Sequence, residues 1–481
     1  MAEGTPGDHK LGGEALALGV LAAWSRAPYL VWLPQDPDGA RFALGVARFD
    51  LAQGHPHPPG YPVYISLGKA LWRLLGGPPA QALSALSALA FGALVALVYA
   101  RARGSLGRSG ALLAAWACAL SPTMAVHGTR GLTDLPGAAL AWAAVLLWRR
   151  PRWCWLLAGL LLGLRPSVSP LVLPALWCGW RARPDERRWC AGALGVGVAG
   201  WLLPTLAVTG TGVWWSLAWV HARGHFGAHG VTLAGEAGVP GRLGALGWGL
   251  WTHVLGGPWR DLSSWLWAWA PGSAVAVVLA WWARASREGG MRARVTASAA
   301  APSREASPEA LGAGLYLGWV FLGQNLEWQP RHLLPLAPCA AWGLAWAASR
   351  GGAPALAAVL ALSLPRALAS HALARTQARE APPVVALGRC ARGVLHREGA
   401  LLAARQTAWW LRHELAPAPV LEVTDAREAR ALAARSGRRV YLVSEVPGAW
   451  EGARGSVCHV QGDRYVWSAL YDLCLVRASG P

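Results

Sequence analysis

The 481-residue chain carries only 14% charged residues beside 54% hydrophobic ones, 31 tryptophans and a formal net charge of +19. Soluble domains average about 25% charged residues, so a water-exposed globule of this length would lack the polar groups to cover its surface. The composition therefore argues against a soluble enzyme. It also argues against a disordered chain, which would be polar and poor in aromatic residues.

Apolar segments of membrane-spanning length recur along most of the chain. A hydrocarbon core about 30 Å thick requires roughly 20 apolar residues per helix. The sequence predicts an all-α polytopic membrane protein with about eleven spans, at residues 13–33, 79–100, 109–127, 135–148, 153–164, 167–180, 190–208, 263–283, 308–326, 333–349 and 353–371. The fifth and sixth are short, and they could also form one span with a break at Arg165-Pro166.

The distribution of arginines predicts the orientation of these spans, because cytoplasmic loops collect Lys and Arg. With the N-terminus inside, the inner loops hold 16 basic residues in about 48 positions, whereas the opposite loops hold 10 in about 115. This topology places the N-terminus in the cytoplasm and Arg165 at the outer end of a helical hairpin. It explains the positive charge as a membrane signal, so no nucleic-acid partner is expected.

Residues 1–375 are thus expected to form a membrane module with two long outer segments, 34–78 and 209–262, and residues 376–481 a small α/β domain outside the membrane. The predicted strands of this domain are 419–423, 439–444 and 472–476, and the predicted helices are 400–414 and 426–436. Two of its three cysteines could pair in an oxidising compartment. These cysteines are Cys390, Cys458 and Cys474.

The first outer segment combines acids with a proline-fixed turn. Asp36 and Asp38 follow the first span, and His55, His57 and Tyr61 stand among four prolines that restrict the backbone. A flexible linker would use Gly and Ser instead, so these side chains are candidates for a binding site. The alternative is a stiff interfacial loop whose aspartates cap the next helix.

These residues resemble a known family. The sequence Pro-Asp-x-x-Arg-Phe-Ala at 37–43, followed by His-Pro-His-Pro-Pro-Gly-Tyr-Pro-Val-Tyr at 55–64, resembles the first outer loop of GT-C membrane glycosyltransferases. It is most similar to bacterial proteins related to protein O-mannosyltransferases and to the lipid A aminoarabinose transferases. The resemblance implies an active-site acid at Asp38, with Arg41 in the same context and Asp36 as the fallback. Gly39 replaces the family's Glu, which leaves a second adjacent acid without support.

Three further outer turns fit the same resemblance, which covers roughly residues 15–350. The turn at 127–136 contains Asp134, where the family places an Asp near its catalytic cleft. Gly163-Leu-Arg165-Pro166 resembles the family's Arg-Pro turn. The segment 327–335 contains Glu327, Arg331 and His332, with His332 in place of the usual Tyr.

The resemblance implies transfer of a sugar from a polyprenyl-phosphate donor to a lipid, glycan or protein acceptor on the outer face of a bacterial inner membrane. A carboxylate, here Asp38, would take the proton of the acceptor hydroxyl. Arg165, Arg331 and Arg41 would bind the donor phosphate, although Arg165 and Arg331 could instead snorkel to the interface. Asp134 could orient these arginines, bind the acceptor or cap the following helix. The candidates for substrate binding are His55, His57, Tyr61, Glu327, His332 and His225.

A metal site is a weaker hypothesis. His221, His225 and His229 are spaced to line up along a helix, but glycines weaken that helix and no local Asp or Cys joins them. No cofactor is implied with certainty. The main alternative function is a multi-pass transporter or a lipid-linked-sugar flippase, which would tend to show internal repeats and polar residues at mid-membrane depth.

Overall fold

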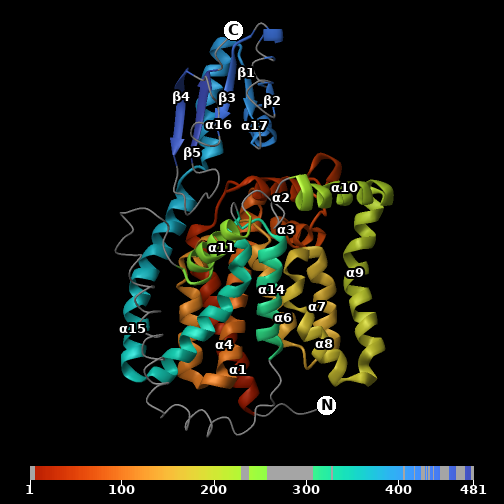
Figure 1. Cartoon of the computed structure of the whole chain (residues 1–481), viewed down its shortest axis with the longest axis vertical. Helices are drawn as coiled ribbons and strands as arrows, with labels where there is room; N and C mark the ends of the chain where they lie inside the picture. Colours follow the sequence, from red (N-terminus) through yellow and green to blue (C-terminus); the bar gives the residue numbers. More distant parts are fainter. Residues whose placement is uncertain are drawn as a thin grey trace. The chain divides into compact units, whose positions relative to one another are not determined.

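The computed structural model shows a mostly helical protein that ends in a small sheet (Figure 1). It describes residues 6–228, 238–256, 307–326, 329–404, 407–416, 418–423, 428, 431, 434–436, 438–444, 454–461 and 472–477. The predicted span at 263–283 lies outside these residues. The contacts divide the chain into two compact units: unit 1 comprises residues 1–30 and 41–374, and unit 2 comprises residues 31–40 and 375–481. The sequence did not indicate that residues 31–40 group with the C-terminal ones.

Unit 1 is a helical bundle. Its first half contains α1 (Pro6–Trp24), α2 (Pro37–Ala47, shared with unit 2), α3 (Pro62–Leu75), α4 (Pro79–Ala119), α5 (Pro122–His127), α6 (Asp134–Leu146), α7 (Pro151–Leu164), α8 (Leu173–Ala182) and α9 (Arg187–Thr209). Its second half contains α10 (Thr211–Arg223), α11 (Gly238–Gly249), α14 (Pro308–Gly323) and α15 (Ala337–Arg379, which continues into unit 2). Short helical turns join them at Ala27–Tyr29, Leu51–Gln53, Pro166–Leu171 (η3), Pro184–Glu186, Gly224–Ala228, Leu250–Val254 (η6) and Pro330–Leu336 (η8).

Two of these helices each cover two predicted spans. A continuous helix of 41 or 43 residues, such as α4 or α15, would be about 60 Å long at about 1.5 Å per residue, twice the thickness of a bilayer core. In α4 the helix is broken at Gly107, whose φ of 70° and ψ of −174° are not helical. The predicted loop between the second and third spans is therefore a single-residue break.

Small residues allow the helices to pack closely. A Cβ added to Gly19 of α1 would lie 2.9 Å from the carbonyl oxygen of Gly92 on α4, and a Cβ on Gly159 of α7 would lie 2.7 Å from the oxygen of Leu194 on α9. Helix interfaces in membranes use small residues in this way. The buried core of unit 1 includes residues of α4, α6, α14 and α15.

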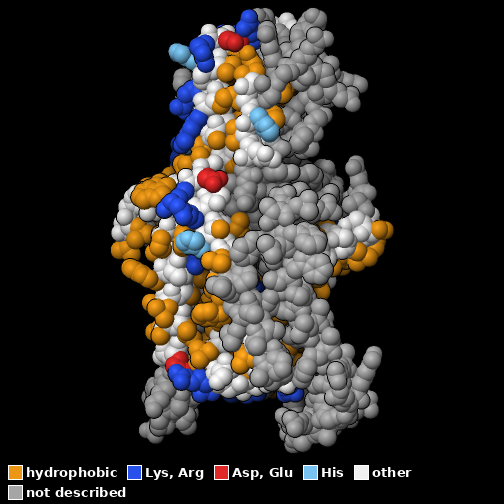
Figure 2. All heavy atoms as spheres, turned by 90° about the vertical axis from the view of Figure 1, so that its left-hand side faces the viewer, with side chains coloured by type: hydrophobic (Ala, Val, Ile, Leu, Met, Phe, Trp, Pro, Cys, Tyr) orange, Lys and Arg blue, Asp and Glu red, His pale blue; other side chains and the backbone are white. Residues whose placement is uncertain are grey.

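The helices also carry the apolar surface expected of a membrane protein. Among the described residues, two helices are long and apolar enough to cross a bilayer, Pro79–Ala119 and Pro184–Thr209, and Asp134–Leu146 and Pro151–Leu164 are shorter apolar helices. Figure 2 shows apolar side chains over one face of the bundle, bordered by Lys and Arg side chains at its lower end. Arg165 separates α7 from η3 and α8, as the hairpin prediction requires.

Unit 2 contains a five-stranded mixed sheet in the order β2-β1-β3-β5-β4. The strands are β1 (Leu401–Ala404), β2 (Val420–Glu422), β3 (Val440–Ser444), β4 (Arg454–Gln461) and β5 (Asp472–Arg477), and the helices are α16 (Pro383–Glu398) and α17 (Ala408–Leu415). Strands β1, β2 and β3 run parallel, and β5 is antiparallel to β3 and β4. A disulfide joins Cys390 of α16 to Cys458 of β4.

The predicted helix at 400–414 is wrong in its first part. Residues 401–404 form β1, which pairs with strands on both sides. All four side chains are buried, so burial on both faces of the sheet overrides the helix propensity of Leu and Ala. Strand β4 was not predicted, and most of the predicted helix at 426–436 lies outside the described residues.

Candidate active site

Polar groups of unit 1 gather around the turn between α5 and α6. Two serines of α4 fix this turn: Ser84 donates a hydrogen bond to the carbonyl oxygen of Thr129, and Ser87 donates one to that of Arg130, each at 2.6 Å. Because both hydroxyl groups are buried, they satisfy carbonyls that water cannot reach. The turn therefore presents the first residue of α6, Asp134, in a fixed position.

Asp134 lies between two arginines that are distant from it in sequence. Its Oδ1 is 2.9 Å from a terminal nitrogen of Arg165, and its Oδ2 is 3.8 Å from Nε of Arg331. The exposed fraction is 2% for the Asp134 side chain, 8% for Arg165 and 9% for Arg331. Interfacial snorkelling would leave the guanidinium groups exposed, so this geometry does not fit that alternative. The structure brings three of the predicted site residues into one buried cluster.

Arg165 owes its position to a helix end and to a glycine. Helix α7 ends where Arg165 adopts a φ of −158° and a ψ of 85°, and its side chain then lies against α6. A Cβ on Gly137 would lie 2.7 Å from Cδ of Arg165, so only glycine leaves room for it there. The guanidinium group also donates to Oγ1 of Thr133 at 2.6 Å and lies 3.1 Å from Nδ1 of His332.

Arg331 and His332 are held by the short helix η8. Trp142 of α6 donates its indole N–H to the carbonyl oxygen of Pro335 at 2.8 Å, and Tyr316 of α14 donates its hydroxyl to that of His332 at 2.6 Å. Both bonds anchor the backbone of η8 to neighbouring helices. Its arginine and histidine side chains consequently meet Asp134 and Arg165 without a flexible loop between them.

The cluster carries more positive than negative charge. Arg130, in the same turn as Asp134, is 3% exposed. Asp134 is the one acid among the buried polar side chains of the described residues. Burial and the positive charges of Arg130 and Arg331 lower the pKa of His253, on η6, to about 3. His253 is thus neutral at pH 7, and the net charge of Arg130, Arg165, Arg331 and Asp134 is positive.

A fourth buried arginine has a different role. Arg242 of α11 is 6% exposed, and its guanidinium group donates to carbonyl oxygens of Val320, Phe321 and Gln324. The carbonyl oxygens of Phe321 and Gln324 lie at and just after the C-terminal end of α14, where carbonyls have no donor in the helix, whereas that of Val320 also accepts from the backbone N–H of Gln324. Arg242 therefore stabilises the end of α14, from which the chain continues to Arg331.

Two acids of the first outer segment, Asp36 and Asp38, belong to unit 2. Asp36 accepts a hydrogen bond from the backbone N–H of Gly39 at 2.8 Å, which is the bond of an N-cap residue. The alternative in which Asp36 caps the following helix is therefore present in the structure. Asp38 lies in the first turn of α2 and is partly buried.

The proline-rich turn packs against α2 within unit 1. A Cβ on Gly45 would lie 2.8 Å from Cδ of Pro56, and Asp50 and His55 exchange two backbone hydrogen bonds. The ring of His57 lies 5.0 Å from that of Tyr61 and 5.9 Å from that of His221, measured between centroids. Two substrate-binding candidates are thus in contact with each other.

The other candidates lie on other elements or outside the described residues. Arg41 is a partly buried residue of α2, and His225 contacts the carbonyl oxygen of Gly323 through Nε2 at 2.9 Å. Glu327 and His229 lie outside the described residues. Within the described part of the chain, no group of three His, Cys, Asp or Glu side chains is arranged to hold a metal ion.

Sequence reasoning did not assign a role to Arg130, His253 or Arg242. Arg130 could have been found, because it stands four residues before Asp134 in the same outer turn. His253 and Arg242 lie in the second outer segment, where no motif distinguishes them. Their roles depend on contacts across more than 70 residues of sequence.

Comparison with known proteins supports the resemblance. Residues 56–176, about a quarter of the chain, match the family model described as dolichyl-phosphate-mannose-protein mannosyltransferase. This quarter of the chain is thus similar to that family. The matched segment contains both Asp134 and Arg165, so two members of the cluster lie where the relationship is detected.

Solved structures give a distant likeness. The chain is similar to ArnT from Cupriavidus metallidurans, determined with undecaprenyl phosphate (13% identity, 97% of this chain and 98% of that chain, TM-score 0.46) and in the apo state (14%, the same coverage, TM-score 0.48). It is also similar to the Archaeoglobus fulgidus oligosaccharyltransferase tethered to an acceptor peptide (12% identity, 89% of this chain and 69% of that chain, TM-score 0.46). No curated protein sequence matches the chain. The family match carries the relationship.

Proposed function

We propose that this protein is an integral-membrane glycosyltransferase that transfers a sugar from a polyprenyl-phosphate donor to a lipid, glycan or protein acceptor on the outer face of a bacterial inner membrane. The observation that carries this proposal is the buried cluster in which Arg165 and Arg331 pair with Asp134, with buried Arg130 in the same turn as Asp134. Guanidinium groups held in a buried site are suited to a phosphate, because charge-assisted hydrogen bonds to its oxygens are stronger than neutral ones.

Each residue then has a chemical task. Arg165 and Arg331 donate charge-assisted hydrogen bonds to the phosphate, which becomes the leaving group when the sugar is transferred. Asp134 orients both guanidinium groups before the donor binds. The general base that takes the proton of the acceptor hydroxyl is proposed to be Asp38, on the resemblance of residues 37–43 to the family's first outer loop.

The proposed architecture extends the described helices to about eleven spans. It includes the predicted span at 263–283, a cytoplasmic N-terminus and an extracytoplasmic C-terminal domain that begins near residue 376. The disulfide between Cys390 and Cys458 supports this orientation, because disulfides persist in oxidising compartments.

Binding of undecaprenyl phosphate to the purified protein tests the phosphate site without knowledge of the sugar. Arg165→Gln and Arg331→Gln are expected to weaken binding at least tenfold. Arg152→Gln is the control, because Arg152 pairs with Glu186 in an exposed position. Equal binding by all four proteins would contradict the proposed site.

Transfer from a panel of radiolabelled polyprenyl-phosphate sugars to membrane lipids and proteins then tests the reaction. Asp38→Asn should lower the rate by about 10²–10⁴-fold, the usual contribution of a general base, while undecaprenyl phosphate still binds. Wild-type transfer by Asp38→Asn would refute the base assignment. Movement of the labelled lipid across proteoliposomes without any glycosylated product would instead indicate the flippase.

A further inference from the structure

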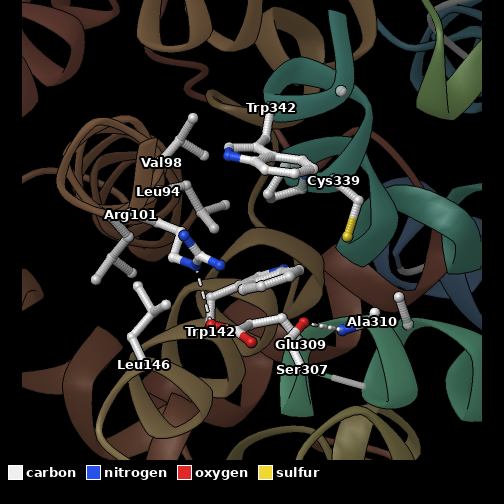
Figure 3. Close-up of a pocket in the computed structure, with 14 residues that line it drawn as sticks. Leu94, Val98, Arg101, Trp142, Leu146, Ser307, Glu309, Ala310, Cys339 and Trp342 are labelled. Carbon is white, nitrogen blue, oxygen red and sulfur yellow. Dashed lines mark hydrogen bonds and ion pairs between the residues drawn. The ribbon is translucent and has the colours of Figure 1, made fainter. Parts of the chain in front are cut away.

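A cavity lies in unit 1 among α4, α6, α14 and α15 (Figure 3). Its volume is about 400 Å³, within the range of small-ligand sites. The residues that line it are Leu94, Leu97, Val98, Arg101, Trp142, Leu146, Ser307, Glu309, Ala310, Ala313, Pro338, Cys339, Trp342 and Gly343. It shares none of the arginines of the Asp134 cluster.

The tryptophan and serine side chains of the lining are already engaged in hydrogen bonds within the protein. The indole N–H of Trp142 is bonded to the carbonyl oxygen of Pro335 at 2.8 Å, and that of Trp342 to Oγ of Ser105 at 3.2 Å. The hydroxyl of Ser307 accepts from the backbone N–H of Ala310 and caps α14. With these polar atoms already engaged, the cavity offers mainly carbon surfaces, which suit a hydrocarbon chain rather than a sugar or a cluster of water molecules.

One charged pair stands at the edge of this surface. Nε of Arg101 lies 2.9 Å from Oε1 of Glu309, and the side chains are 34% and 16% exposed. Among the described residues, no acceptor is bonded to the two terminal nitrogens of Arg101. Figure 3 shows Arg101 and the rings of Trp142 and Trp342 turned toward one another across the cavity. Arg101 therefore combines a fixed Nε with terminal donors that can bind an anion.

The position of this pair along the helices indicates the source of the ligand. Arg101 is six residues before the break at Gly107, and Glu309 is in the first turn of α14. The distribution of arginines assigns both helix ends to the cytoplasmic side. Basic pockets between helices on that side bind anionic lipid headgroups.

We propose that this cavity binds an anionic phospholipid of the cytoplasmic leaflet, with one acyl chain between Trp142 and Trp342 and its phosphate on the terminal nitrogens of Arg101. Apolar lining alone would accept any lipid chain. The free donors of Arg101 add the preference for negative charge. The proposal does not depend on the sugar-transfer site, because none of the charged residues of the Asp134 cluster lines this cavity; Trp142 alone contributes to both, through its ring here and through its N–H to η8 there.

The full-length protein in nanodiscs provides the test, with phosphatidylglycerol that carries a photoreactive diazirine on its acyl chain. After irradiation, mass spectrometry of peptides should find adducts on Trp142, Cys339 or Trp342. Phosphatidylcholine with the same reactive chain should give at least fivefold less labelling at these residues. Equal labelling by the two lipids would overturn the headgroup assignment.

Two variants test separately how the cavity and the charged pair at its edge contribute to lipid binding. Gly343→Leu should fill the cavity and abolish labelling without disturbing the fold, since a Cβ at Gly343 meets no atom within 4 Å and Leu favours the helix over Gly. Gly318→Leu is its control, because that site on α14 is equally open but outside the cavity. Labelling that persists in Gly343→Leu would overturn the proposal.

Arg101→Gln should reduce labelling by phosphatidylglycerol to the level of phosphatidylcholine. Its control is Arg152→Gln, since Arg152 also pairs through Nε with a glutamate, at 2.8 Å, and also lies over a tryptophan ring. A benzoylphenylalanine in place of Trp342, a lining residue of similar size, tests for the other possible occupant. If it cross-links to residues 263–283 of the same chain and not to lipid, the cavity is filled by the protein itself and the proposal is wrong.

Discussion

Removal of the negative charge of Asp134 should destabilise the protein strongly. Asp134→Asn keeps the shape of the side chain but leaves Arg165, at 2.9 Å, and Arg331, at 3.8 Å, without their carboxylate. At an effective dielectric constant of about 20, two unit charges about 4 Å apart attract by roughly 4 kcal/mol. Loss of one partner from a buried pair costs about 3–5 kcal/mol, because the remaining charge is buried without compensation. We expect a loss of this size in the free energy of unfolding.

A double-mutant cycle in detergent micelles measures this interaction. Asp134→Asn, Arg165→Gln and the double variant are compared by denaturant unfolding, and we expect a coupling energy above about 1.5 kcal/mol, since contacting residues in one charged network couple by about 0.5–3 kcal/mol. The control is Glu186→Gln, because Glu186 also contacts two arginines, at 2.8 and 3.4 Å, but these arginine side chains are 53% and 54% exposed. An exposed pair contributes about 0–1 kcal/mol. If Asp134→Asn costs no more than Glu186→Gln, or if the coupling stays within about 0.5 kcal/mol of zero, the buried charge network does not exist as described.

Three further outcomes are expected. Arg242→Gln should speed hydrogen exchange at residues 320–326, since the carbonyl oxygens of Phe321 and Gln324 lose their donor, while Arg223→Gln, an exposed arginine over Trp219, should not. Equal exchange in both variants would contradict the capping role. Cys390→Ser should lower the stability of unit 2 by about 2–4 kcal/mol, with Cys474→Ser as the control, and a loss no larger than the control's would contradict a stabilising disulfide. Burial lowers the pKa of His253 to about 3, so below about pH 6.5 the unfolded chain binds a proton that folded His253 does not, and this residue's contribution to stability should fall by about 1.4 kcal/mol per pH unit. His253→Gln should reduce the slope of the unfolding free energy between about pH 4 and 6 by that amount, and an unchanged slope would contradict a buried, neutral His253.

The sequence predicted the structure best where a single physical requirement, such as the apolar length of a membrane span, determines an element. Apolar length located most of the described helices of unit 1, and the Arg165-Pro166 break separates α7 from α8 as predicted. The two helices longer than one span could not be predicted as such. The break in α4 is the single residue Gly107. Nothing in the sequence around it distinguishes this glycine from the many glycines that remain helical.

The candidate site shows the same limit. The sequence could single out three members of the cluster, Asp134, Arg165 and Arg331. Each follows an apolar span and lies in a turn that resembles one of the GT-C glycosyltransferases. Their contacts could not be predicted, since these depend on Gly137 leaving room for Arg165 and on Trp142 and Tyr316 holding η8. The helix predicted at residues 401–404 was wrong for a related reason. Local propensity there favours a helix, and these residues form a strand only because they pair with strands about 20 and 40 residues away.

The charge of the cluster suits the departing group of the proposed reaction better than the donor. Arg130, Arg165 and Arg331 with Asp134 give a net charge of +2, since His253 remains neutral. A sugar phosphodiester carries one negative charge, whereas the polyprenyl phosphate that leaves approaches two, because the second pKa of a phosphate monoester is about 6. Charge that develops during the reaction is therefore stabilised more than charge already present in the substrate, which is the condition for acceleration. Arg130→Gln lowers the net charge to +1, which matches the donor but not the leaving group. It should reduce kcat more than it raises KM, and the opposite pattern would mean that the cluster only binds the donor.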